Sequence, residues 1–159
     1  MEIERKFLVD HPPLELAVQA TTLRQGYLAV DATRQSSVRI RQAGDRCTLT
    51  TKAQVPGLGM VARHEVEIPL SIRDFEALWP LTAGERVEKQ RYLIPLGNLT
   101  AEVDCFDHGL QMVEVEFQTL EAAQVFEPPS WFDREVTNDP QFTNTWIARH
   151  GNPLMTQDR

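Results

Sequence analysis

Pairs of like-charged side chains recur at alternate positions along this sequence, and they are the residues best suited to chemistry. The first pair is Glu2 and Glu4, followed by Lys6. Residues at i, i+2 and i+4 of a β-strand point to the same face, so the two carboxylates would share a face and repel each other. Water on an exposed face, or a cation in a closed site, would offset that repulsion.

Later segments repeat this pattern with one sign of charge at a time. The further pairs are Arg39 and Arg41, Glu65 and Glu67, Lys89 and Arg91, Glu102 and Asp104, and Glu114 and Glu116, and Lys52 shares a face with Thr48 and Thr50. For any single strand, a charged face turned to water is the simplest interpretation. For the whole set, same-sign pairs cost energy unless a site compensates them, which favours a closed, charge-lined interior.

The elements that would position these pairs are short strands joined mostly by hairpins. Alternation and turn residues predict strands at about 2–9, 22–30, 37–41, 47–52, 61–68, 85–96, 100–106 and 110–117. Apolar stripes and capping residues predict short helices at about 72–79, 120–126 and 144–150. The apolar strand faces would supply the surface that those stripes cover. We therefore predict a mainly β (α+β) fold, a closed eight-stranded antiparallel β-barrel with short helices packed outside.

Length and composition predict a single domain over residues 1–159, with 152–159 as a loose tail. There is no apolar run of transmembrane length and no secretory signal pattern. The widely spaced Cys47 and Cys105 fit reduced thiols in a cytoplasmic protein. A net charge of −7 argues against nucleic-acid or membrane-surface partners. A monomer and a homodimer are both compatible with the sequence.

An interior with both signs of charge has a defined chemical use. Basic residues would hold a compact polyanion, and carboxylates would hold hard divalent cations through oxygen ligands. Together these are the requirements of phosphoryl transfer, in which positioning and charge neutralisation supply most of the catalysis.

This order of motifs resembles the CYTH superfamily of triphosphate tunnel metalloenzymes, and the length resembles its short bacterial inorganic triphosphatases. The resemblance runs from residue 2 to residue 117, and residues 23–28 and 135–137 add to it. Residues 141–144 depart from the basic-Tyr-x-Asn run of such members. The resemblance implies metal-dependent hydrolysis of the terminal phosphoryl group of inorganic triphosphate, yielding pyrophosphate and phosphate.

The same resemblance implies roles for individual residues. Ligands of the Mg²⁺ or Mn²⁺ cofactor would be Glu2, Glu4 and Glu116, with Asp104 and Glu114 as candidates for a second metal. Residues that bind the triphosphate would be Lys6, Arg39, Arg41, Lys52, Lys89 and Arg91. Candidates for the group that activates or orients the attacking water are Tyr27, Lys52, Glu65 and Lys89.

Several alternatives stay open on the same scaffold. These are a nucleoside or thiamine triphosphatase, an adenylate cyclase, and a non-catalytic protein that binds triphosphate or polyphosphate. The full set of carboxylates favours catalysis over simple binding, because a pure binder needs basic residues more than metal ligands. The sequence offers no evident aromatic clamp for a base, which favours a small inorganic substrate.

Overall fold

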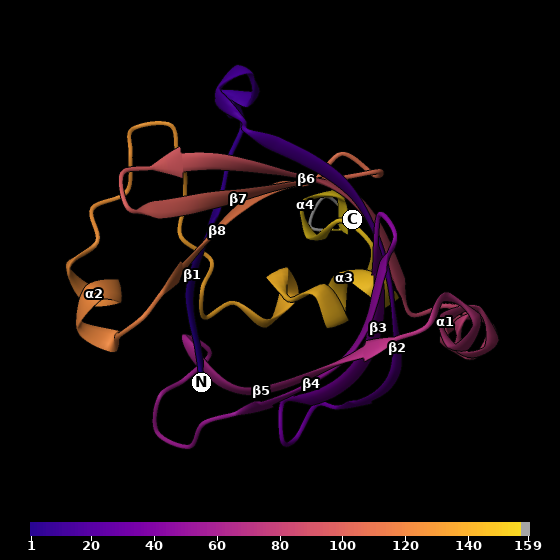
Figure 1. Ribbon diagram of the computed structural model, residues 1–159. Coiled ribbons are helices and arrows are strands. Elements are labelled where there is room, and N and C mark those ends of the chain that lie inside the picture. The colour runs from indigo at the N-terminus through magenta and orange to yellow at the C-terminus, as the bar shows by residue number, and fades with distance from the viewer. Residues whose placement is uncertain (157–159) are drawn as a thin grey trace.

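The chain folds into a closed barrel of eight antiparallel strands in a computed structural model that describes residues 1–156 (Figure 1). The strands are β1 (Glu2–Leu8), β2 (Gln19–Asp31), β3 (Ser36–Ala43), β4 (Arg46–Gln54), β5 (Ala62–Leu70), β6 (Arg86–Leu96), β7 (Leu99–Phe106) and β8 (Gln111–Phe117). Their order around the barrel is β1-β5-β4-β3-β2-β6-β7-β8. The predicted barrel is thus confirmed in strand number, antiparallel pairing and closure.

Short helices connect and flank the strands. They are α1 (Ile72–Leu78), α2 (Leu120–Val125), α3 (Asn144–His150) and α4 (Pro153–Thr156), with 3-10 turns η1 (Leu14–Leu16), η2 (Trp79–Thr82) and η3 (Pro140–Phe142). The hydroxyls of Ser71, Thr119 and Thr143 cap the N-termini of α1, α2 and α3. Helix α4 occupies part of the predicted loose tail, and residues 157–159 lie outside the described chain. Within residues 1–156, no helix combines the length and apolar character needed to span a membrane.

Strand β1 closes the barrel. It pairs with β8 along almost its whole length, but with β5 only at Glu2 and Ile3. In the β1–β8 register, Glu4 lies opposite Glu116. Closure of the barrel therefore brings carboxylates of the first strand and the last strand together, as the sequence predicted.

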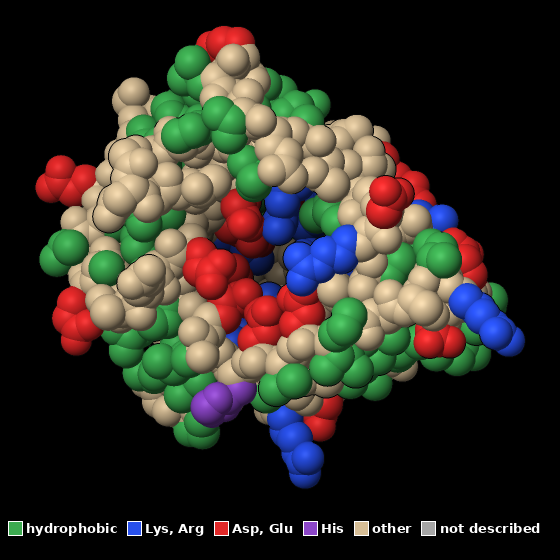
Figure 2. Space-filling model, viewed as in Figure 1, with side chains coloured by type: hydrophobic (Ala, Val, Ile, Leu, Met, Phe, Trp, Pro, Cys, Tyr) green, Lys and Arg blue, Asp and Glu red, His purple; other side chains and the backbone are tan. Residues whose placement is uncertain are grey.

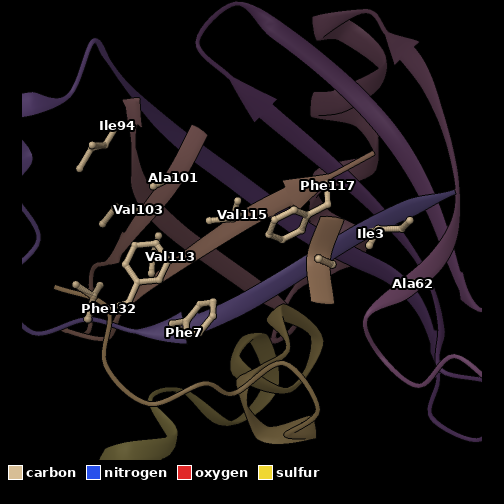
Figure 3. Close-up of a cluster of buried hydrophobic side chains, with 12 residues drawn as sticks. Ile3, Phe7, Ala62, Ile94, Ala101, Val103, Val113, Val115, Phe117 and Phe132 are labelled. Atoms are coloured by element: carbon tan, nitrogen blue, oxygen red, sulfur yellow. The ribbon is translucent and has the colours of Figure 1, made fainter. Parts of the chain in front are cut away.

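The largest apolar core lies on the outer surface of the barrel wall (Figure 3). Outward side chains of β1 and β8, among them Phe7, Val113 and Val115, are buried under α2 and residues 126–136. The Phe7 and Phe132 rings pack with centroids 5.0 Å apart. A second outer core forms where Phe75 of α1 packs on β3 and β4. Because these strands bury their apolar faces outward, alternation turns their charged faces inward.

The expectation that the helices pack outside is correct for α1 and α2 but wrong for α3, which lies inside the ring of strands (Figure 1). Phe142 of η3 and Ile147 of α3 pack against Phe106 and Met112. Alternation places those two strand residues on the inward faces of β7 and β8. The outward Val66 of β5 stays 63% exposed instead of being covered. The charged interior is consequently bounded at one end by η3 and α3.

Candidate active site

A cavity of about 180 Å³ enters the barrel interior and is lined mainly by charged and hydroxyl side chains. Figure 2 shows acidic and basic side chains gathered around its opening. We call this cavity the tunnel. The predicted site residues that line it are Glu2, Glu4, Lys6, Tyr27, Arg39, Arg41, Lys52, Glu65, Arg91, Glu114 and Glu116. The structure therefore brings most of the predicted site together in one enclosed space.

Lys89 and Asp104 do not line the tunnel but lie behind its wall. Their side chains are 0% and 1% exposed, and Lys89 Nζ lies 2.7 Å from Asp104 Oδ2. Lys89 also donates a hydrogen bond to Asn144 Oδ1 at 2.9 Å, and Arg91 donates to both Asp104 oxygens at 2.7 and 2.8 Å. Because Lys89 and Asp104 are buried in this network, Lys89 could contact substrate, and Asp104 a metal, only after the network rearranges.

Burial and neighbouring charges shift the pKa values of Lys89 and Asp104 in opposite directions. Burial lowers the pKa of Lys89 to about 8, although Asp104 acts to raise it. Burial would raise the pKa of Asp104, but the charges of Arg91 and Lys89 outweigh it and lower that pKa. The network thus holds Asp104 ionised, and it fixes the guanidinium of Arg91 at the tunnel surface.

Two arginines of β3 form the basic wall of the tunnel. Arg39 is buried, and its Nε has no hydrogen-bond partner among the described residues. Arg41 Nε donates to Gln25 Oε1 at 2.9 Å. Burial, and then the charge of Arg39, lower the pKa of Arg41 to about 10. A buried N–H donor without a partner is costly by itself, so this wall is suited to an anion that completes the hydrogen bonds of Arg39.

Lys6 adds a further cation at the inner end of the tunnel. Its Nζ lies 3.3 Å from Glu114 Oε1 and donates to the carbonyl of Phe142 at 3.1 Å. Burial opposes ionisation of Glu114, but Lys6 and Arg91 hold its pKa well below the usual range. Glu114 is therefore already paired with cations in the described chain.

The remaining carboxylates carry an excess of negative charge. Burial, and then the charge of Glu114, raise the pKa of Glu4. Burial, followed by the charge of Glu2, raises the pKa of Glu116. Burial likewise raises the pKa of Glu2, although Lys52 donates to it at 2.7 Å. These carboxylates would be stabilised in their charged form by an additional cation.

The carboxylate oxygens of the tunnel are the kind of ligand that a hard divalent cation prefers. Oxygen ligands from two or three carboxylates leave room for water and phosphate oxygens, as Mg²⁺ requires. Glu2, Glu4 and Glu116 supply such oxygens from adjoining strands. No three acidic, histidine or cysteine side chains within residues 1–156 form a ready-made metal cage. The fit therefore rests on the nature and charge of the donors.

Three of the four predicted catalytic candidates face the tunnel. Lys52 Nζ lies 3.5 Å from Glu65 Oε2, which is buried without a hydrogen bond from the described residues. The neighbouring Glu2 side chain, followed by the charge of Lys52, lowers the pKa of Glu65 although burial opposes them. Tyr27 Oη lies 3.4 Å from Gln25 Nε2, which donates to it. The fourth catalytic candidate, Lys89, is buried behind the tunnel wall and does not reach the tunnel.

Sequence reasoning missed six residues that help to build the site. They are Gln25, Ser37, Arg63, Thr143, Asn144 and Thr145. The first three alternate with predicted tunnel residues on β2, β3 and β5, so alternation alone would have included them. The last three begin α3, and only the packing of that helix inside the barrel places them at the tunnel.

Comparison with known proteins agrees with this architecture. A CYTH domain model matches residues 1–128. The chain belongs to the CYTH domain family. It is 44% identical over 152 residues to an inorganic triphosphatase of Nitrosomonas europaea, covering 92% of this chain and 96% of that protein. An inorganic triphosphatase of Acetivibrio thermocellus is 34% identical over 152 residues, with 94% of each chain covered.

Solved structures show the same CYTH barrel. The crystal structure of an inorganic triphosphatase superposes with a TM-score of 0.68 at 42% identity, covering 94% of this chain and 95% of that one. A Pyrococcus horikoshii protein superposes with a TM-score of 0.62 at 18% identity, covering 78% and 82%, which supports the fold alone. The family match ends at residue 128, so the helix inside this CYTH barrel lies beyond the matched segment.

Arg39 offers a test of the basic wall in this CYTH tunnel. We expect Arg39→Met to raise the KM for inorganic triphosphate about 10- to 100-fold, because a charge-assisted hydrogen bond contributes roughly 1.5–3 kcal/mol. Without substrate the variant should be at least as stable as the wild type in urea, because its buried Nε has no partner. Arg34→Met, at a largely exposed turn position, is the control. An unchanged KM would contradict the assignment of Arg39 to substrate.

Proposed function

We propose that this CYTH protein hydrolyses the terminal phosphoryl group of inorganic triphosphate inside the tunnel, releasing phosphate and pyrophosphate. The observation that carries the proposal is the coexistence, in one small cavity, of a buried arginine whose Nε has no hydrogen-bond partner among the described residues and a group of carboxylates with raised pKa values. The first is suited to a phosphate anion, and the second to the cations that accompany it. The inorganic triphosphatases at 44% and 34% identity, aligned over nearly the whole chain, support the same reaction.

The basic wall would hold and orient the substrate. Arg39, Arg41 and Arg91 present planar guanidinium groups, which suit bidentate contacts with phosphate oxygens. Lys6 and Lys52 add compact charges at two other points of the lining. Because these cations come from four different strands, the triphosphate would be held along its length while charge develops on the leaving pyrophosphate.

The acidic wall would hold the cofactor, Mg²⁺ or Mn²⁺. Glu2, Glu4 and Glu116 are the proposed ligands, because burial raises the pKa of each of them, of Glu2 even beside Lys52, so that a cation would stabilise their charged forms. A divalent ion bound there supplies Lewis-acid neutralisation of phosphate oxygens. Asp104 and Glu114 are less suited to a second metal, since both are already held by basic side chains.

Glu65 is the proposed acceptor for a proton of the attacking water. One of its oxygens is buried in the tunnel wall without a hydrogen bond from the described residues, and its lowered pKa keeps it ionised and able to accept a hydrogen bond from the water. Lys52, 3.5 Å away, would keep this carboxylate oriented. The phenol of Tyr27 lies in the same lining and would position the water through its hydroxyl.

A phosphate-release assay tests the function directly. With Mg²⁺ or Mn²⁺ we expect rapid release of phosphate from inorganic triphosphate, little from pyrophosphate, and loss of activity in excess EDTA. Two outcomes would contradict the proposal: tight binding of triphosphate without release, which would indicate a non-catalytic binder, or release that is unaffected by EDTA.

The setting of the enzyme is also part of the proposal. Both Cys47 and Cys105 are free thiols. Unpaired cysteines are typical of a reducing compartment, which supports a cytoplasmic location.

A further inference from the structure

The segment that leads into α3 is tied to the inner end of the tunnel by two buried lysines. Lys6 Nζ, from β1, donates a hydrogen bond to the carbonyl of Phe142 at 3.1 Å. Lys89 Nζ, from β6, donates to Asn144 Oδ1 at 2.9 Å. The two lysine side chains are 7% and 0% exposed. Two strands that are not neighbours in the barrel therefore hold the same short segment against the tunnel.

The contact with Lys89 fixes which end of the Asn144 amide faces the tunnel wall. An ammonium group has N–H donors and no acceptor, and this one also lies 2.7 Å from Asp104 Oδ2. The amide atom that meets Lys89 is therefore the oxygen, and the NH2 group points away from it. Among residues 1–156, none accepts a hydrogen bond from that NH2 group. Because Asn144 lines the tunnel, its NH2 group is the polar end that remains for the tunnel.

The acidic groups at this end of the tunnel are already paired with cations and do not need the amide. Glu114 lies 3.3 Å from Lys6 and 3.8 Å from Arg91. Asp104 accepts two hydrogen bonds from Arg91. Arg39 Nε, a buried donor in the same cavity, also lacks a partner among the described residues. A phosphate oxygen is the acceptor that would complete such donors.

We propose that Asn144 is a substrate-binding residue whose NH2 group donates to an oxygen of the phosphate at the inner end of the tunnel, and that Lys89 is its positioning residue. The inference rests on the proposed function, because the tunnel must first hold the triphosphate. It gives a role in the reaction to the segment that follows residue 128, where the family match ends. It also gives Lys89, whose side chain is 0% exposed, a way to act on the substrate through the amide.

Nuclear magnetic resonance tests this contact without altering it. The ligand is the methylene-bridged analogue of inorganic triphosphate, which cannot be hydrolysed, added with Mg²⁺ to the isotope-labelled full chain. The side-chain NH2 signals of Asn144 are assigned by their absence from the spectrum of Asn144→Asp. We expect one of these proton signals to move downfield as the ligand binds. The NH2 signals of Asn138, which is exposed and outside the tunnel lining, should stay in place.

Calorimetry with the same ligand and Mg²⁺ measures the size of the contribution. Asn144→Ala should raise the Kd about 10- to 100-fold, the range expected for a hydrogen bond to a charged group. Asn138→Ala is the matched control, because it also removes an amide whose oxygen accepts a hydrogen bond, in this case from the N–H of Met60 at 3.3 Å. Since Asn138 does not line the tunnel, this variant should leave the Kd unchanged.

Asn144→Asp separates the contact with substrate from the contact with Lys89. Its carboxylate still accepts from Lys89, so urea denaturation should show at least the stability of the wild type. Asn144→Ala should be less stable, because the buried Lys89 loses an acceptor. The aspartate nevertheless lacks the NH2 donor, so its Kd should rise at least as much as that of the alanine variant.

A double variant tests the positioning role of Lys89. In a Lys89→Met background, Asn144→Ala should raise the Kd by a smaller factor than in the wild type, because the amide is no longer held in place. Equal factors in the two backgrounds would overturn that role.

The remaining outcomes distinguish this inference from the proposed function. NH2 signals of Asn144 that do not respond to bound ligand would overturn the contact but leave the proposed function intact, and so would an unchanged Kd in Asn144→Ala. Wild-type affinity in Asn144→Asp would show that the amide only supports Lys89, and it would overturn the contact as well. A wild-type chain that does not bind the analogue would overturn both the inference and the proposed function.

Discussion

Replacing Glu4 by glutamine will reduce turnover of inorganic triphosphate by about 100-fold or more, the scale typical of losing one group that stabilises charge in a transition state. Glu4 lies at the β1–β8 seam opposite Glu116, and burial together with Glu114 already raises its pKa. A neutral amide at this position removes a proposed metal ligand, and it also removes a negative charge that Glu114 repels. The variant should therefore lose activity without losing stability.

The dependence on metal concentration separates this role from a general structural one. If Glu4 binds the cofactor, the Mg²⁺ or Mn²⁺ concentration that gives half-maximal rate should rise in Glu4→Gln. Glu15→Gln, at an exposed position in η1, is the matched control and should behave as the wild type. A rate that falls while its metal dependence is unchanged would contradict the assignment of Glu4 as a ligand, and so would an unchanged rate.

Asp104→Ala should have the largest effect on stability, about 3–5 kcal/mol of unfolding free energy. The carboxylate is 1% exposed and accepts hydrogen bonds from Arg91, and Lys89 lies 2.7 Å away. Its removal leaves two cations in the barrel wall without their main partner. Urea denaturation at neutral pH measures the loss. Asp107→Asn, on the exposed turn after β7, is the control and should cost little.

A double variant and a pH series show whether stranded charge is the cause. Lys89→Met in the Asp104→Ala background should restore part of the stability, because it removes one of the unpaired cations. The pKa of Asp104 is lowered in the folded state, so its contribution is present above the unfolded pKa of about 3.9. That contribution is lost as pH falls through the folded pKa, so the advantage of the wild type should shrink in acid. An advantage that is constant with pH would contradict the electrostatic explanation.

The barrel itself was predictable because its signal is repeated. Strict alternation fixes which side chains share a face, and same-sign pairs on six of the eight strands leave few arrangements other than a closed charged interior. The depth of each charge within that interior was not predictable. Lys89 and Arg91 follow the same alternation, yet only Arg91 lines the tunnel, because Asn144 and Asp104 cover Lys89.

The position of α3 illustrates a different limit. Its apolar stripe predicts a helix that covers an apolar surface, but the stripe does not say which surface. Inward-facing Phe106 and Met112 at the end of the barrel offered one, and the helix packs there. As a result Thr143 and Thr145, which carried no functional signal in the sequence, line the tunnel. Sequence reasoning had no means of placing this helix inside the barrel.

The seam between β1 and β8 also determines when an active site can exist during synthesis. Strand β1 is made first, but its long partner β8 is made only after the other six strands, and β5 holds it at Glu2 and Ile3 alone. Loop-closure entropy opposes so distant a pairing until the intervening hairpins are in place. The carboxylates of β1 therefore meet Glu116 in the last step of barrel assembly. A chain in which β8 has not yet paired with β1 would carry the basic residues of the tunnel without a completed acidic wall, so it could hold triphosphate before it was able to cleave it.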